Sequence, residues 1–147
     1  MNGQAQTTAF EPDIVVLYCG HCIREDRSII SALESVKGFS ARCSMVSCSS
    51  QIEVSHVLKL LEQGVDGVEV IACSEGACKS LVGSARAEKR VRYAQTLLGN
   101  IHMNAERLGI SRKKTGITVE DIVGLATERA DAVRALGPNH MKNGGKK

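Results

Sequence analysis

The chain contains 147 residues, which is enough for one domain of ordinary size with a single core. Hydrophobic residues make up 43% of it and charged residues 24%, a composition typical of globular proteins that excludes a disordered chain. The net charge is +3, and Lys142, Lys146 and Lys147 account for that much, so total charge does not indicate non-specific nucleic-acid binding.

The amino-terminal residues 1–12 are polar and lack the basic and apolar regions of a signal peptide. No apolar run reaches the roughly 20 residues that span a bilayer. We therefore expect a cytoplasmic protein without a membrane segment. Thiols stay reduced in that compartment, so the six cysteines indicate metal or redox chemistry before structural disulfides.

The first part of the chain alternates short apolar runs with amphipathic stretches. Residues 14–18 predict a buried strand that ends at Cys19. Residues 29–36 carry apolar side chains at helical spacing, and Gly38 is placed to end that helix. Residues 41–46 predict a second strand, which is less apolar and should therefore lie nearer an edge of the sheet.

A second helix and a third strand follow. Ser50 and Glu53 have the spacing of a capping box, which satisfies backbone N–H groups at a helix start. Residues 54–61 then place apolar side chains on one helical face, and Gly64 stops the run. Residues 67–72 predict a buried strand that leads into a cysteine.

The last part of the chain predicts two more helices around a short strand. A long helix is expected over residues 80–108, either continuous or broken at Gly83 or Gly99, and ended by Gly109. Residues 114–117 predict a fourth strand. Thr118 and Asp121 form another capping box before a final amphipathic helix.

This alternation predicts an α/β fold, with one domain of about four mostly parallel strands and helices on both faces. We expect a flexible amino terminus over residues 1–12, the folded domain over residues 13–137 and a flexible basic tail over residues 138–147. In such sheets, ligands bind beyond the carboxyl ends of the strands.

The cysteines form three pairs in the sequence, namely Cys19 with Cys22, Cys43 with Cys48, and Cys73 with Cys78. Five of them end a predicted strand or follow one, and parallel topology brings those positions to one edge of the sheet. Cys43 lies within a strand and is expected to be a core residue.

Five thiols at one edge can serve more than one kind of site. An iron–sulfur cluster takes four thiolates, and zinc takes four ligands in tetrahedral geometry. Zinc ribbons usually place their ligand pairs in a small β domain, whereas these thiols would come from three separate loops. We therefore favour iron–sulfur over zinc.

The same residues carry a resemblance to a known family. A strand leading into Cys-x-x-Cys, a second ending Val-x-Cys-Ser, and a third leading into Cys-x-x-Gly-x-Cys occur here at residues 18–22, 46–49 and 73–78. Together with residues 58–70, this order resembles the delta (iron–sulfur) subunit family of methyl-viologen-reducing hydrogenases. The resemblance covers roughly residues 13–110.

The resemblance implies a small subunit that binds a [2Fe–2S] cluster and catalyses nothing by itself. It would pass electrons between a partner oxidoreductase and a flavoprotein of the heterodisulfide reductase type. Related subunits serve hydrogenase, formate dehydrogenase or methylene-tetrahydrofolate reductase assemblies, so the partner oxidoreductase would be of one of these types. The resemblance also implies a role in anaerobic metabolism.

Five cysteines match recurring cysteines of the family, namely Cys19, Cys22, Cys48, Cys73 and Cys78. A cluster takes four ligands, and we expect Cys48, Cys73 and Cys78 together with Cys19, which we prefer to Cys22 because it lies nearest the end of its strand. Cys22 is then the additional thiol, although the sequence does not settle which of the five is not a ligand. Cys43 has no counterpart.

Several positions depart from the family pattern. His21 stands where the family has Trp, Ser49 and Ser50 replace Gly-Arg, and the last motif has Ser74 and Ala77 in place of His and Asp. These substitutions leave the five thiols intact. Hydrogen bonds and charge near cluster sulfurs tune the reduction potential, so the potential and the docking partner are the properties affected.

Two other functions stay open from the residues alone. Cys19 and Cys22 could form the redox-active dithiol of a thiol–disulfide or persulfide-handling protein. Alternatively, zinc could stabilise an interaction module. A nucleotide cofactor is not supported, because the first strand leads into Cys-Gly-His-Cys and not into a glycine-rich phosphate loop.

A basic run occurs within the long helix, at Arg86, Lys89, Arg90 and Arg92. Such a run is usually a solvated helix face. The low aromatic content, 3%, disfavours nucleic-acid binding, so a docking surface for an acidic partner subunit is the functional hypothesis for it.

Overall fold

The computed structural model describes residues 10–19, 26–46, 52–73, 83–113 and 118–141. Within these residues the four strands are β1 (Asp13–Cys19), β2 (Ser40–Val46), β3 (Gly67–Cys73) and β4 (Leu108–Lys113). They alternate with the α-helices α2 (Asp26–Glu34), α3 (Val54–Glu62), α4 (Gly83–Asn100) and α5 (Val119–Leu136). A short 3-10 helix, η3 (Ala105–Arg107), precedes β4.

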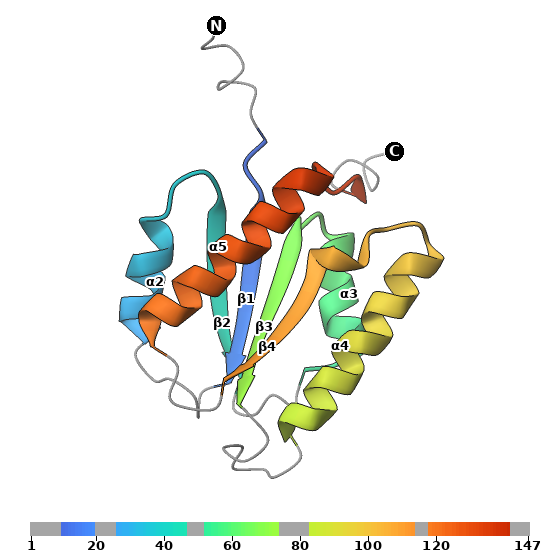
Figure 1. Ribbon diagram of the computed structural model, residues 1–147, viewed down its shortest axis with the longest axis horizontal. Helices are drawn as coiled ribbons and strands as arrows, with labels where there is room; N and C mark the ends of the chain where they lie inside the picture. The colour runs from blue at the N-terminus through green and yellow to red at the C-terminus, as the bar shows by residue number, and fades with distance from the viewer. Residues whose placement is uncertain (1–9, 20–25, 47–51, 74–82, 114–117, 142–147) are drawn as a thin grey trace, which may run out of the picture.

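The strands form one parallel sheet in the order β2-β1-β3-β4 (Figure 1). Helices cover both faces of it. The predicted class, a single α/β domain with a four-stranded parallel sheet and helices on both faces, is confirmed.

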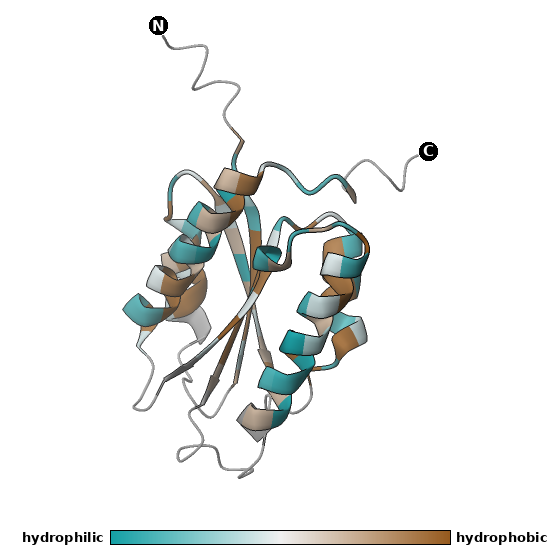
Figure 2. Ribbon diagram, turned by 45° about the vertical axis from the view of Figure 1, so that its right-hand side comes forward, coloured by the Kyte–Doolittle hydropathy of each residue, from teal (hydrophilic) through white to brown (hydrophobic). Residues whose placement is uncertain are grey.

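Two hydrophobic cores lie on opposite faces of the sheet. Alternate residues of β1 point to opposite sides, so Val16 packs with α2 and α5, whereas Leu17 packs with α3 and α4. Each helix carries both hydrophobic and hydrophilic residues (Figure 2), as expected where one side faces the sheet and the other faces solvent.

β2 lies at an edge of the sheet, as its mixed composition predicted. Its residues alternate between exposed and half-buried, whereas β1, in the interior of the sheet, is buried from Ile14 to Cys19. The apolar content of each strand therefore reports its place in the sheet.

One of the two predicted capping boxes is present. The backbone N–H of Asp121 donates to Thr118 Oγ1 at 3.1 Å, and the N–H of Thr118 donates to Asp121 Oδ2 at 3.0 Å. The other prediction is wrong, because Glu53 is itself the N-cap of α3 and its side chain makes no capping hydrogen bond. Ser50 lies outside the described residues.

α4 covers residues 83–100 of the helix predicted over 80–108 and ends beside Gly99, one of the two break points considered. A continuous helix to Leu108 is wrong. His102 adopts a left-handed conformation with φ of 64°, and the N–H of Met103 bonds back to the carbonyl of Leu98 at 2.8 Å. This turn breaks the helical pattern, so the fourth strand begins at Leu108 and not near Lys114.

Glycines after two helices behave differently. Gly64 follows α3 almost directly, with φ of 106°, as predicted. Gly38 also has a positive φ, but α2 ends earlier, at Glu34, so this glycine serves the turn before β2.

Buried polar residues tie together the amino-terminal end of the sheet. The carboxylate of Asp66 accepts from the backbone N–H groups of Asp13 and Asn139, both at 2.8 Å. Arg107 donates to the carbonyls of Asp66, Gly137 and Pro138 at 3.1, 2.8 and 3.2 Å. These contacts hold the chain after α5 against the sheet, on the end opposite to the strand ends that carry cysteine.

Candidate metal centre

Two of the predicted cysteines end neighbouring strands. Cys19 is the last residue of β1, and Cys73 is the last residue of β3. β1 and β3 are paired in parallel, with Tyr18 aligned with Ile71. Both cysteines therefore follow the last aligned residues at the same, carboxyl-terminal edge of the sheet.

This edge contains the position at which the chain changes direction across the sheet. From β1 the chain first adds β2 on one side and then β3 on the other, so β1 and β3 flank the switch point. Crevices that bind ligands form at such points in parallel sheets. The arrangement places Cys19 and Cys73 on its two sides.

Cys19 and Cys43 have different surroundings. The side chain of Cys19 is 1% exposed, and neither cysteine is in a disulfide. Cys43 is half-buried within β2, where it is aligned with Val16 and packs against the hydrophobic core of that face. Its placement agrees with the core residue expected from the sequence.

The other candidate ligands lie outside the described residues. These ligands are Cys22, Cys48 and Cys78. His21 and the side chain of Cys73 also lie outside the described part of the chain. Within the parts of the chain that the structure describes, no group of three or more His, Cys, Asp or Glu side chains is gathered for a metal ion.

Of the described thiols, that of Cys19 has the chemistry and the position expected of a cluster ligand. A thiolate is the usual protein ligand of such clusters, and the described edge offers a buried cysteine beside the strand that ends in another. Cys19 is buried, so the surrounding fold excludes water from it. Solvent access is one of the properties that set the reduction potential of a cluster.

Residues 14–137 match the family model described as methyl-viologen-reducing hydrogenase, delta subunit. The chain belongs to this family. The match extends beyond residues 13–110, which carried the resemblance in the sequence, and includes α5.

Curated relatives agree with this assignment, and all three described here are iron–sulfur subunits of F420-non-reducing hydrogenases. The chain is 28% identical over 139 residues to the vhc iron–sulfur subunit of Methanococcus voltae, covering 90% of this chain and 92% of the relative. It is 26% identical over 131 residues to the iron–sulfur subunit of Archaeoglobus profundus, covering 88% and 93%. The vhu iron–sulfur subunit of Methanocaldococcus jannaschii is 26% identical over 103 residues, covering 70% and 76%.

A buried ion pair beneath α5 was not predicted. Glu69, in the middle of β3, is 2% exposed and accepts from Arg129 Nε at 2.8 Å and from the Ser111 hydroxyl at 2.8 Å. Burial raises the pKa of Glu69, although Arg129 and Ser111 oppose that effect. A carboxylate inside an apolar strand was the only sign of this pair in the sequence.

No helix within the described ranges is long and apolar enough to cross a bilayer.

Proposed function

We propose that this chain is a [2Fe–2S] electron-transfer subunit of a cytoplasmic redox complex. It relays electrons between a partner oxidoreductase, of the hydrogenase, formate dehydrogenase or methylene-tetrahydrofolate reductase type, and a flavoprotein of the heterodisulfide reductase type. Membership of the hydrogenase delta-subunit family supports the relay role. The cluster type, the compartment and the partners are our inference.

The observation that carries the proposal is the position of Cys19 and Cys73 at the ends of neighbouring parallel strands. The remaining thiols come soon after strand ends in the chain. Cys22 follows Cys19, Cys48 follows the end of β2 at Val46, and Cys78 follows Cys73. We assign the ligands as Cys19, Cys48, Cys73 and Cys78, with Cys22 as the additional thiol.

A bound cluster of this kind supplies one-electron transfer and no bond chemistry. The chain's own residues would hold it at the edge of the sheet and limit its contact with water. The buried Cys19 supports that role, because solvent access and hydrogen bonding to the sulfurs tune the potential.

The dithiol alternative is less well supported by Cys19. A thiol that attacks a disulfide or persulfide must be accessible as the thiolate, and Cys19 is 1% exposed. The zinc module predicts the same four thiols but no redox activity. The number of electrons that the protein accepts therefore distinguishes the three functions.

The test is a reductive titration of the full chain, purified without air, with dithionite as the electron donor. One electron per iron–sulfur cluster supports the relay, and the reduced protein should then be reoxidised by a flavoprotein of the heterodisulfide reductase type. Uptake of two electrons by iron-free protein that has first been oxidised to the Cys19–Cys22 disulfide indicates the dithiol function. No uptake by protein that contains zinc indicates the interaction module.

A further inference from the structure

α4 presents a continuous outward surface that changes from basic to apolar along its length. Residues spaced by three or four positions share one side of a helix, and here they are Arg86, Lys89, Tyr93, Leu97 and Ile101. Ile101 follows the end of the helix at Asn100. Tyr93 is 57% exposed and Ile101 58% exposed, which is unusual for large hydrophobic side chains. We call this set the α4 surface.

The basic end of the α4 surface has positive charge that the described residues do not neutralise. Arg86 and Lys89 are exposed, and no described residue forms an ion pair with either of them. Since α4 begins at Gly83, Arg86 lies in its first turn, where the helix dipole is also positive, and Lys89 lies in the next turn.

The other two basic residues of the run, Arg90 and Arg92, lie beside carboxylates of the chain itself. Arg90 donates to the carbonyl of Ile52 at 3.1 Å and lies 3.6 Å from the Glu53 carboxylate, which ties α4 to the start of α3. Arg92 lies 3.4 Å from the Glu88 carboxylate. The sequence alone offered all four cations as the docking surface, with Arg90 and Arg92 as the residues to reverse. The contacts in the structure favour Arg86 and Lys89 instead.

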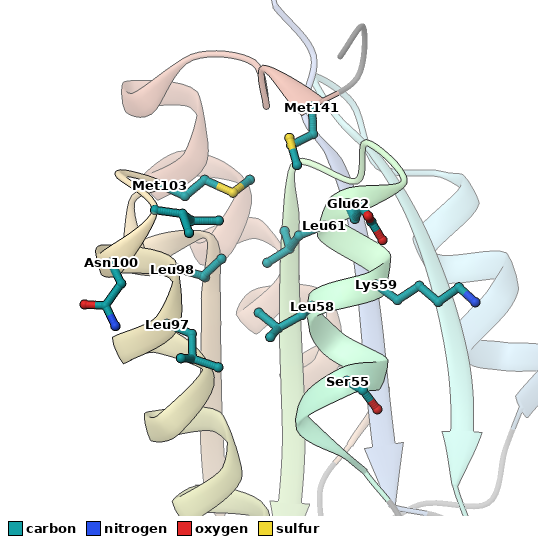
Figure 3. Close-up of a pocket in the computed structure, with 11 residues that line it drawn as sticks. Ser55, Leu58, Lys59, Leu61, Glu62, Leu97, Leu98, Asn100, Met103 and Met141 are labelled. Atoms are coloured by element: carbon teal, nitrogen blue, oxygen red, sulfur yellow. The ribbon is translucent and has the colours of Figure 1, made fainter. Parts of the chain in front are cut away.

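The apolar end of the α4 surface borders a groove of about 630 Å³ between α3 and α4. Its apolar lining comes from Leu58, Leu61, Leu97, Leu98, Met103 and Met141. Figure 3 shows these side chains between the two helices, while Lys59 and Asn100 point away from the groove. Methionine adapts its shape easily and is common where surfaces bind other proteins.

The surface has a defined direction relative to the candidate metal centre. α4 follows β3, so its basic end lies toward the carboxyl-terminal edge of the sheet, where Cys19 and Cys73 end their strands (Figure 1). The groove lies toward the opposite end of α4, where Leu97, Asn100 and Ile101 line it. A partner seated along the surface would therefore extend toward the cysteine edge.

We infer that the α4 surface binds a subunit of the redox complex through an amphipathic helix or strand of that subunit. The bound segment places apolar side chains in the groove and carboxylates beside Arg86 and Lys89. This inference rests on the proposed function. It follows the usual anatomy of interfaces, with aromatic, methionine and arginine residues at the contact and charged pairs at the rim.

A protein segment fits this surface better than nucleic acid does. Phosphate would pair with Arg86 and Lys89, but nucleic-acid bases bind by stacking on aromatic side chains, and the groove is lined by leucine and methionine. Carboxylates on an apolar segment satisfy both ends of the surface together.

The experiment uses the tagged full chain, expressed in its own cells and purified without air with the subunits that accompany it. One variant combines Arg86→Glu with Lys89→Glu, and a second is Ile101→Asp. Lys37→Glu and Ile30→Asp are matched controls, because Lys37 is exposed and Ile30 is 46% exposed on the other side of the molecule. Thermal unfolding and iron content confirm that each variant is folded and loaded.

We expect the double charge reversal to lower retention of the redox subunit about tenfold at low salt, with a smaller effect at high salt. Ile101→Asp should lower retention at both salt concentrations, and the controls should behave as the wild type does. Carbodiimide treatment of the complex should join Lys89 to a carboxylate of the same subunit.

Equal retention by wild type and both surface variants would overturn the inference while leaving the proposed function intact. Loss of self-association or of nucleic-acid binding in the variants, in place of loss of a redox subunit, would overturn it as well. If the wild type retains no redox subunit and contains no iron, the proposed function fails together with the inference.

Discussion

Cys19 and Cys73 end adjacent parallel strands on the two sides of the switch point in the sheet. They are far apart in the sequence and reach the same edge of the sheet only because β3 returns to lie beside β1. A site built in this way depends on the topology of the sheet. Substitution of one of its ligands should lower the iron content, whereas substitution of a cysteine within a strand should not.

Cys19→Ala and Cys43→Ala form a matched pair that tests this dependence. In metal sites, removing a group that hydrogen-bonds to a ligand lowers the metal affinity about tenfold. Cys19→Ala removes a proposed ligand itself, so it should lower the affinity for the cluster by at least that factor. Cys43→Ala should keep the wild-type iron content and lose about 1 kcal/mol of stability, because Cys43 is half-buried in β2. Iron analysis and denaturant unfolding measure the two effects. Equal iron loss in both variants would contradict the assignment.

Gly109 provides space for the buried ion pair. A Cβ atom at this position would lie within 2.5 Å of the Arg129 guanidinium carbon, so an added methyl group would displace the guanidinium from Glu69. Because the guanidinium ends a flexible side chain and can shift, we expect Gly109→Ala to lower the free energy of unfolding by about 1 kcal/mol, the lower end of the range for overpacking.

Gly99→Ala is the control for that substitution, since nothing lies within 4 Å of a Cβ atom there. In a helix, alanine in place of glycine should raise stability by about 0.5–1 kcal/mol. Denaturant unfolding of both variants gives the comparison, and similar changes in the two would show that Arg129 does not need the space at Gly109.

Glu69 should make stability depend on pH. Burial raises its pKa above the ordinary value of 4.5, so the folded state holds the proton more tightly than the unfolded state does. The contribution of Glu69 to stability is therefore greatest below pH 4.5 and falls as the pH rises through the folded pKa.

Glu69→Gln removes this titration and keeps the shape of the side chain. Stability of the wild type relative to the variant should fall as the pH is raised from about 4.5 to about 8, measured by denaturant unfolding at each pH. A relative stability that rises over this range would mean that Arg129 lowers the pKa of Glu69 by more than burial raises it.

Asn139 secures the chain after α5. Its side-chain amide donates to the carbonyls of Leu61 and Val65 at 2.7 and 2.6 Å, and the residue is 1% exposed. Asn139→Ala should lower stability by about 2 kcal/mol, because buried carbonyls lose a donor.

The exposed Asn100 gives the comparison for that variant, and Asn100→Ala should change stability by less than about 0.5 kcal/mol. Thermal unfolding of the two proteins is sufficient. If Asn139→Ala melts with the wild type, the contacts after α5 do not contribute to global stability.

Local patterns in the sequence predicted most of the fold. The apolar runs of β1 and β3, the mixed composition of β2 and the Thr118 capping box each depend on neighbouring residues, and each was recognised. β4 was misplaced because Leu108 continued the helical spacing of α4. The turn at His102, which ends that pattern, has a conformation that its residue type does not reveal.

For the candidate site, the structure can be compared with the prediction at the ends of β1 and β3. Chain order alone indicated that Cys19 and Cys73 would reach one edge of the sheet. Contacts between distant residues were not predictable, and Arg129 lies 60 positions from its partner Glu69. The sequence also did not reveal which cations of the basic run have partners within the fold. Arg90, for example, donates to the carbonyl of Ile52, which lies 38 positions away.

The most direct test of the proposed electron relay is the content of iron, zinc and acid-labile sulfide per chain in protein purified without air. We predict about two iron atoms and about two sulfides per chain, as a [2Fe–2S] cluster requires. Zinc without sulfide, or well-folded protein without metal, would contradict the proposal.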